Sequence, residues 1–458
     1  MDDKTVHDLL DGALAGEPPI GPVAQNALTA GLRLRRRRRR IRAAAATAVA
    51  AVIAVAIPAG LGAFGHLLKP ARPQQPPAPP TLYIYGADLH VRHHRGQVQD
   101  TVTPVGMATN TPGKPIHISG AGMSVGQIVI TPDGNTAYVN TGSNVTPIST
   151  ATGTPGKPIH VRGGFAPGIA ITPDGKTAYV ADWSGPAGQG RTVTPISTAT
   201  NTPGKPIKVG YGTGQIVNGV GQIAVTPDGK TAYAITGTSV TPISTATNTP
   251  GKPIHTGTPN MPGTDHIVIT PDGKTAYVMT GSGVTPISTA TNKAGTTIHV
   301  GQGNLAQIAI TPDGKTVYVS TVFGCHDRPS NEYCTFAVTP ITTATNMPGT
   351  PITVGSGPWT LYDVGQIAIT PDGKTAYVTT GTSVTPVSTA TNTPGKPIHL
   401  GKVNIPGGGG PGGQIVITPD GETAYVTTGS GVTPISTATN TPGEPIHVVG
   451  TIAIAITP

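Results

Sequence analysis

The sequence predicts an all-β protein, a β-propeller built from four-stranded blades. From Thr81 onward, one phrase of short β-type runs separated by turn residues recurs along the chain. The chain holds 63 Gly and 48 Pro, and from Thr81 onward they recur in register with this phrase, so there they mark turns rather than disorder. The last nine residues, "GTIAIAITP", supply only the first run of a phrase, and residues 81–118 supply only the remaining runs. These observations together indicate a repeat that closes on itself.

One complete phrase, Gln366 to Leu400, shows the strands of a blade. Its first run, "QIAIT", ends at Pro-Asp-Gly, where Gly provides the positive φ of a tight hairpin turn. The second and third runs are "TAYVT" and "SVTPVST". After the turn "ATNTPG" comes the fourth run, "KPIHL". We call these strands a, b, c and d, and four antiparallel strands of this kind match one propeller blade.

The repeats predict eight blades. Strand a with its Asp-Gly occurs seven times, at Asp133, Asp174, Asp228, Asp272, Asp313, Asp372 and Asp420. Strands b, c and d occur eight times, so the C-terminal run should be the missing strand a of the first blade and should close the ring. Seven blades with a dispensable end is the alternative.

Proline within strand c conflicts with a regular ladder. A proline stands in every copy: Pro104, Pro147, Pro195, Pro242, Pro286, Pro340, Pro386 and Pro434. Because proline has no N–H to donate, either strand c has a bulge there or its pairing to one neighbour begins after the proline.

The N-terminal 80 residues predict a membrane anchor. Residues 1–42 end in "RLRRRRRRIR", and residues 43–68 are almost uncharged and long enough for one transmembrane helix. The arginines place residues 1–42 in the cytoplasm and the propeller, residues 81–458, outside the cell. A cleaved signal peptide is the alternative. The Pro-rich residues 69–80 predict an extended linker.

The basic charge is poor evidence for nucleic-acid binding. Residues 1–80 hold 11 Lys and Arg against 5 Asp and Glu, whereas the rest of the chain holds 18 against 16. The net charge of +8 therefore belongs mainly to the segment beside the predicted helix, and we expect no nucleic-acid partner.

The stretch "TPDGKTAYVTT", Thr370 to Thr380, together with the "STATN" motif, resembles the YVTN-repeat β-propeller family of bacterial surface and lactonase-like proteins. The resemblance covers roughly residues 81–458. It implies the propeller fold and leaves the function open, because propellers bind, scaffold and catalyse. Such propellers commonly have seven blades, and strand c here carries "TPIST" where the family more often has an Asp.

Ligand binding is predicted on one face of the propeller. The a–b and c–d turns are nearly constant, so we expect their face to be structural. The opposite, variable face carries every large insertion, at residues 181–192, 210–221, 320–337, 355–365 and 401–413. These insertions hold aromatic residues suited to a binding surface, among them Trp183, Tyr211, Trp359 and Tyr362. Small local cores within long loops are the competing explanation.

The start of strand a provides further candidates. Carboxamides open this strand in five blades, and His266 replaces them in a sixth, so a polar ring could surround the channel mouth and hold a ligand such as a glycan; the five are Gln127, Gln222, Gln307, Gln366 and Gln414. Hydrogen bonds between neighbouring blades are the alternative role. Lactonase-like hydrolysis is the second functional hypothesis, and it requires Asp265, His266 and Asp363 to converge.

The two cysteines, Cys325 and Cys334, lie in one insertion of the sixth blade and predict a disulfide, because they have no other partners and the domain should be extracellular. A metal site with His326 and Asp327 is the competing reading. We expect binding rather than catalysis, no cofactor and no metal. The expected partner is a cell-surface glycan, polymer or protein.

Overall fold

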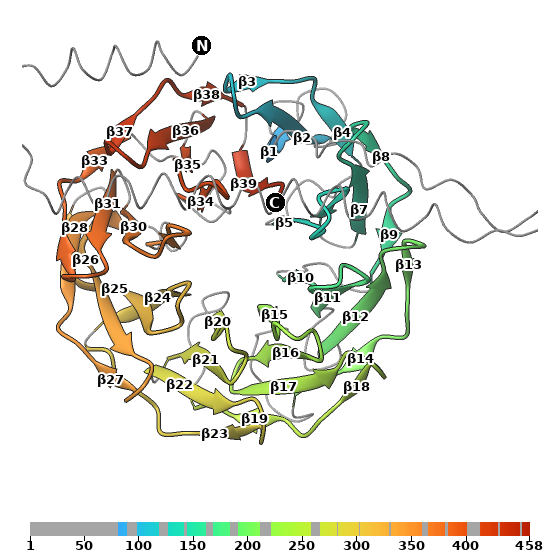
Figure 1. Cartoon of the computed structure of the whole chain (residues 1–458), viewed down its shortest axis with the longest axis horizontal. Coiled ribbons are helices and arrows are strands. Elements are labelled where there is room, and N and C mark those ends of the chain that lie inside the picture. The colour runs from blue at the N-terminus through green and yellow to red at the C-terminus, as the bar shows by residue number, and fades with distance from the viewer. Residues whose placement is uncertain are drawn as a thin grey trace, which may run out of the picture. The chain divides into compact units, whose positions relative to one another are not determined.

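The computed structural model describes residues 81–88, 99–118, 127–141, 144–161, 168–183, 191–210, 221–257, 266–281, 283–301, 303–328, 331–359, 365–380, 383–400, 413–428, 431–448 and 451–458. Within these residues, eight antiparallel sheets stand around a common centre, with one strand of each sheet innermost (Figure 1). The prediction of an all-β propeller with eight four-stranded blades is confirmed.

The strands of the first four blades follow the order a, b, c, d, and strand d of each blade consists of two short pieces. Blade 1 contains β39 (Thr451–Ile456), β1 (Thr81–Asp88), β2 (Gln99–Gly106), β3 (Thr111–Pro112) and β4 (Ile116–Ile118). Blade 2 contains β5 (Gln127–Ile130), β6 (Thr136–Asn140), β7 (Asn144–Ser149), β8 (Thr154–Pro155) and β9 (Ile159–His160). Blade 3 contains β10 (Ile169–Ile171), β11 (Thr177–Trp183), β12 (Arg191–Ser197), β13 (Thr202–Pro203) and β14 (Ile207–Lys208). Blade 4 contains β15 (Ile223–Val225), β16 (Thr231–Thr236), β17 (Ser239–Ser244), β18 (Thr249–Pro250) and β19 (Ile254–His255).

The other four blades have the same order. Blade 5 contains β20 (His266–Ile269), β21 (Thr275–Thr280), β22 (Gly283–Ser288) and β23 (Lys293–Ala294). Blade 6 contains β24 (Asn304–Ile310), β25 (Thr316–Arg328), β26 (Asn331–Thr342), β27 (Met347–Pro348) and β28 (Ile352–Trp359). Blade 7 contains β29 (Ile367–Ile369), β30 (Thr375–Thr380), β31 (Ser383–Ser388), β32 (Thr393–Pro394) and β33 (Ile398–His399). Blade 8 contains β34 (Ile415–Ile417), β35 (Thr423–Thr428), β36 (Gly431–Ser436), β37 (Thr441–Pro442) and β38 (Ile446–His447).

The outer strand of the blade explains the proline in strand c. The register between strands b and c runs through the proline without a shift, as at Tyr179 opposite Pro195. On the other side, strand d is divided into two short pieces, of which β13 pairs with strand c after the proline and β14 pairs with it before the proline. Between them, Gly204 N donates to Pro195 O at 2.7 Å. No bulge forms, because the missing N–H of the proline faces the break in strand d.

The a–b turn is built by local hydrogen bonds of its own residues. In blade 7, Thr370 Oγ1 donates to Asp372 Oδ1 at 2.7 Å, and Lys374 N donates to the same oxygen at 3.0 Å. Gly373 closes the turn with a φ of 72°, a conformation that favours glycine. The Thr370 hydroxyl is the main cause that lowers the pKa of Asp372 to about 2. Thr-Pro-Asp-Gly therefore fixes the hairpin locally.

The hydrophobic core lies between neighbouring blades. Each cluster joins two adjacent sheets, as where Tyr233, Val240 and Ile254 of blade 4 pack against Ile267 and Val278 of blade 5. The strand b tyrosines are buried almost completely. The blades are thus held together by apolar surface that none of them could bury alone.

The C-terminal strand completes blade 1, as predicted. β39 pairs antiparallel with β1, with Ile454 opposite Ile84. Thr81 N donates to Thr457 Oγ1 at 2.8 Å, and Thr457 N donates to Thr81 O at 3.1 Å. The ring is therefore closed by one sheet formed from both ends of residues 81–458.

The predicted anchor, residues 43–68, and the flanking segments 1–42 and 69–80 lie outside the described residues. The chain divides into two compact units, Met1–Pro76 and Pro77–Pro458, and the second contains the propeller. Among the residues that the structure describes, no helix is long and apolar enough to cross a membrane.

Candidate functional site

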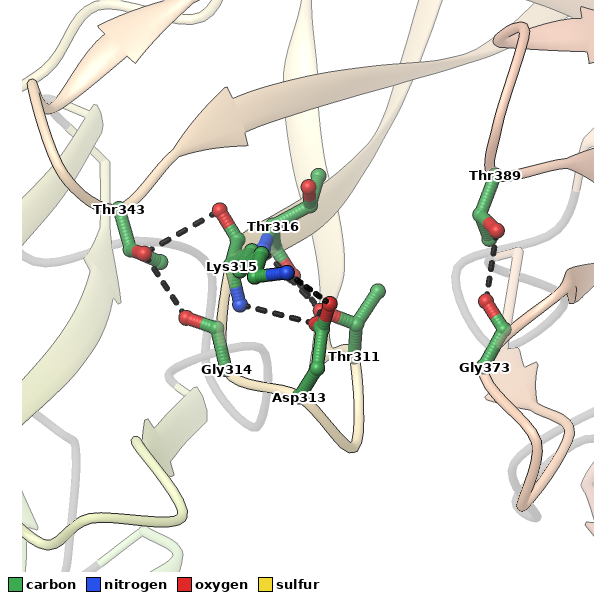
Figure 2. A network of polar contacts seen from close by, with 8 residues as sticks. All are labelled: Thr311, Asp313, Gly314, Lys315, Thr316, Thr343, Gly373 and Thr389. Atoms are coloured by element: carbon green, nitrogen blue, oxygen red, sulfur yellow. Dashed lines mark hydrogen bonds and ion pairs between the residues drawn. The ribbon is translucent and has the colours of Figure 1, made fainter.

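The turn face is made of the same hydrogen bonds in blade after blade. The c–d turn binds the a–b turn of its own blade, as where Thr389 Oγ1 donates to Gly373 O at 2.6 Å and Thr343 Oγ1 donates to Gly314 O at 2.8 Å (Figure 2). This contact places the a–b and c–d turns on one face, as expected. The Lys–Asp pairs of these turns are exposed, for example Lys315 with Asp313 at 3.5 Å, and contribute little to stability. We interpret this face as structural.

A tyrosine–asparagine bond joins seven of the eight blades to the next one in the ring. The strand b tyrosine donates its hydroxyl to the Asn of the following "STATN" turn, as from Tyr138 to Asn201 Oδ1 at 2.6 Å. Six further junctions repeat it, including Tyr425 to Asn110 across the ring closure. These asparagines have φ between 52° and 55°, a region that Asn tolerates. Where Gly153 replaces Asn, Tyr83 donates to Thr150 O at 3.1 Å instead.

The variable face carries an extension of blade 6. β25 and β26 continue as a hairpin, and β28 follows β26 outward, with Trp359 opposite Glu332. Residues 320–328, 331–337 and 355–359, which we predicted as loops, are therefore strands of a three-stranded sheet. They form strands because the neighbouring d strand is lengthened as well and pairs with the hairpin.

The predicted disulfide between Cys325 and Cys334 is present, within the hairpin rather than in a loop. The register shifts between Phe323 and His326, at the point where Gly324 adopts a φ of 60°. Both sulfurs of the competing metal site take part in this disulfide, so neither is a free thiolate that could bind an ion. The side chains of His326 and Asp327 lie outside the described residues.

Removing the disulfide should loosen the extension and spare the ring. In the chain-entropy model, a loop of this size is worth about 2.5–3 kcal/mol. We expect Cys325→Ser with Cys334→Ser to increase hydrogen exchange in β25, β26 and β28, while the melting of the other blades changes little. A matched control is Thr335→Ser, in the same hairpin. Unchanged exchange in the extension would contradict a stabilising role for the bond.

The aromatic residues predicted to form the binding surface do not all lie in loops. Trp183 ends β11 opposite Arg191, and Trp359 ends β28, so both lie on strand extensions rather than in loops. Their side chains, and all of Tyr211, Tyr362 and Phe165, lie outside what the structure describes. Phe336 is buried in the core between blades 6 and 7. Phe336, an aromatic residue of the insertion at residues 320–337, therefore belongs to the main core between blades and not to a small core within a loop.

The glutamines at the start of strand a connect neighbouring blades. Gln127 Oε1 accepts the Ile169 N–H at 2.9 Å, Gln222 Oε1 accepts the Ile267 N–H at 2.8 Å, and Gln414 Oε1 accepts the Ile454 N–H at 2.7 Å. Each carboxamide thus caps an amide on the inner strand of the next blade, the alternative role that we considered for this ring. Their role in ligand binding stays a prediction.

Three positions of this ring depart from that pattern, at His266, Gln307 and Gln366. Gln307 Nε2 donates to Gln366 Oε1 at 3.0 Å, which leaves Gln307 Oε1 buried. His266 stands where other blades have Gln, and its Nδ1 is also buried. Among the described residues, neither atom has a hydrogen-bond partner. Burial lowers the pKa of His266 to about 4, so its imidazole is neutral at pH 7.

The hydrolase hypothesis requires Asp265 and Asp363 to converge with His266. His266 lies on an innermost strand, whereas Asp265 and Asp363, which would have to meet it, lie outside the described residues.

Eight four-stranded blades closed by both ends of one domain define an eight-bladed β-propeller. No family model matches the chain, and no curated protein is similar to it in sequence.

Among solved structures, hydrazine synthase of Kuenenia stuttgartiensis is 22% identical, with a TM-score of 0.51 over 68% of this chain and 95% of that chain. The dihydro-heme d1 dehydrogenase NirN is 12% identical, with a TM-score of 0.58 over 84% of this chain and 77% of that chain. A 6-phosphogluconolactonase-like protein of Bacteroides fragilis is 16% identical, with a TM-score of 0.49 over 84% and 99%. At such identities, the first two show a shared fold alone.

Sequence reasoning missed the tyrosine–asparagine bonds. A signal was present, because "AYV" and "STATN" recur together and the first "STAT" turn ends in Gly153 instead of Asn. Sequence reasoning also missed that His266 and Gln307, at the same position in neighbouring blades, do not cap the next blade as Gln127, Gln222 and Gln414 do.

Proposed function

We propose that this chain is a membrane-anchored, extracellular propeller of the YVTN-repeat type that binds a cell-surface glycan, polymer or protein through its variable face. The contrast between the two faces is the observation that carries the proposal. One face repeats the same turn-to-turn hydrogen bonds in blade after blade. The other bears a disulfide-linked, three-stranded extension of blade 6.

Rigid presentation supports binding at this face. The extension continues the strands of a packed blade, and Phe336 anchors it in the core between blades 6 and 7. Side chains on an ordered strand lose less conformational entropy on binding than those on a free loop. Aromatic residues on such a frame are typical anchors of binding surfaces.

Replacing Trp183 and Trp359 by Ala should weaken attachment without unfolding the propeller. Because single anchors contribute about 2 kcal/mol or more, we expect the pair to lower affinity by more than about tenfold. The measurement is retention on isolated cell envelopes and on a glycan array. Lys374→Ala on the turn face is the matched control and should bind normally. Undiminished retention of the double variant would argue against the variable face.

Hydrolysis of lactones or esters is the second candidate, favoured by one observation. His266 has an unpartnered Nδ1 on an inner strand and is neutral at pH 7, although a pKa of about 4 makes it a weaker base than an imidazole that titrates near pH 7. Turnover by the purified protein that is lost in His266→Gln would replace the binding proposal with this one.

The proposed topology leads to a separate test. If residues 43–68 span the membrane and residues 69–80 form an exposed linker, protease added to intact cells should release a resistant fragment of roughly residues 81–458. A closed ring whose outer edge strands are short resists cleavage, whereas an extended Pro-rich segment does not. The control is a cytoplasmic protein, which should stay intact. Release only after lysis would show that the topology is wrong.

A further inference from the structure

The capping pattern of the inner strands changes at successive positions in the centre of the ring. At three junctions, the residue that opens strand a caps the inner strand of the next blade with its carboxamide oxygen. At the junctions from blade 5 to 6 and from blade 6 to 7, the corresponding residues are His266 and Gln307, and each keeps a buried atom without a partner among the described residues. Buried polar atoms without partners are costly, so they call for an explanation.

The two residues belong to adjacent inner strands. β20 and β24 pack against each other. Ile267 packs toward blade 4, and Val268 packs toward blade 6. Because side chains alternate along a strand, His266 lies on the side of Val268 and faces blade 6. Gln307 in blade 6 reaches Gln366 in blade 7.

The backbone of blade 6 changes at the same point. β24 begins earlier than the other described a strands outside blade 1, and its register shifts between Leu305 and Gln307. Such bulges redirect a side chain and are common beside functional sites. Here the shift accompanies a glutamine that binds another glutamine rather than a backbone amide. The same blade carries the disulfide-linked extension.

Both departures lie at the variable face. Strand a runs from its first residue toward the Pro-Asp-Gly turn, so His266 and Gln307 stand at the end opposite the turn face. The blade 6 hairpin leaves the ring at this end as well, because it is the connection between strands b and c.

We infer that His266 and Gln307 form a binding site at the centre of the ring for a neutral, polyhydroxylated ligand of the sugar class. Gln307 Oε1 can only accept a hydrogen bond, so its partner must donate. A neutral imidazole nitrogen can exchange a hydrogen bond with a hydroxyl group, which both donates and accepts. Neither residue supplies a positive charge, so the pair does not favour an anion.

This inference rests on the proposed function and specifies its ligand class. The test uses the purified full-length chain at pH 7 and follows binding of glucose, galactose, mannose and N-acetylglucosamine by saturation-transfer NMR and calorimetry. We expect at least one of these sugars to bind with a dissociation constant of about 1 mM. Glucuronate, an anionic analogue, should bind no better.

The decisive variant is His266→Gln, which restores the residue found elsewhere in the ring and should stay folded. It should weaken sugar binding about tenfold, the effect of one lost hydrogen bond. Gln307→Met tests the second residue in the same way. Lys374→Ala, an exposed position on the turn face, is the matched control and should leave sugar binding unchanged.

Three results would overturn the inference: no binding of any of the four neutral sugars, unchanged binding in both His266→Gln and Gln307→Met, or preferential binding of glucuronate. Envelope retention that is lost in the tryptophan variants but normal in His266→Gln, with no sugar bound, would leave the proposed function intact and remove this site. Sugar binding together with normal retention of the tryptophan variants would support this sugar site and contradict the proposed function.

Discussion

Deletion of Thr451–Pro458 should open the ring and leave the propeller largely unfolded at physiological temperature. The deletion removes the whole of β39 and exposes the inner edge of β1. It also removes the buried Ala453 and Ile454 from the cores on either side of blade 1. Because one buried Ile-to-Ala change alone costs about 2–5 kcal/mol, we expect a loss of about 5 kcal/mol or more, comparable with the total stability of a domain.

Two hydrogen-bonded contacts across the closure disappear as well. Gln414 Oε1 loses the Ile454 N–H, and Thr81 N loses the Thr457 hydroxyl. Thermal unfolding followed by circular dichroism measures the effect. Deletion of residues 2–9, which lie outside the propeller unit, is the matched control.

A milder variant separates closure from failure to fold. Ile454→Ala keeps the strand and its backbone pairing but removes a side chain that is 2% exposed. It should lower the free energy of unfolding by about 2–5 kcal/mol. A truncated chain that melts at the wild-type temperature would mean that the ring does not depend on this strand.

Replacement of Tyr318 by Ala should be the most destabilising single change between blades. Its ring is fully buried in the cluster that joins blades 6 and 7, and its hydroxyl donates to Asn392 Oδ1 at 2.6 Å. Removal of a buried aromatic ring costs about 3–5 kcal/mol. Burial also raises the pKa of Tyr318 to about 12, so at neutral pH the hydroxyl remains a donor.

The contribution of the Tyr318–Asn392 hydrogen bond can be measured separately from that of the buried aromatic ring. Tyr318→Phe keeps the packing and should cost about 1–2 kcal/mol. Asn392→Gly keeps the backbone, whose φ is 54°, and removes the same acceptor. If both variants lose the same hydrogen bond, the double variant should lower the free energy of unfolding by less than the sum of the two single effects. Strict additivity in urea unfolding would show that the residues act independently.

Tyr83→Phe is the matched control for this series. Tyr83 donates to a backbone carbonyl, Thr150 O, at 3.1 Å, because Gly153 stands at the asparagine position. We expect its loss to cost less than that of the Tyr318 hydroxyl, since the remaining carbonyl can bind water.

The sequence by itself determined the features that depend on neighbouring residues and on the count of repeats. Pro-Asp-Gly fixed the a–b turn, since Gly373 supplies the positive φ and Asp372 binds the turn through groups within two residues. The missing strand a of blade 1 required the C-terminal run, so eight blades and closure followed from counting. The pairing of Cys325 with Cys334 also followed, because the chain has no other cysteine.

Only the tertiary structure decided what distant residues do to one another. Tyr138 and Asn201 lie 63 residues apart, and Gln127 and Ile169 lie 42 apart, so no local pattern reveals that these pairs meet. The division of strand d opposite the proline depended on how three strands align. The extension of blade 6 depended on β28 pairing with β26, and the unpartnered atoms of His266 and Gln307 depended on which neighbour each side chain could reach. Sequence periodicity specifies which face of a strand is buried, but contacts between blades are set by the ring that brings them together.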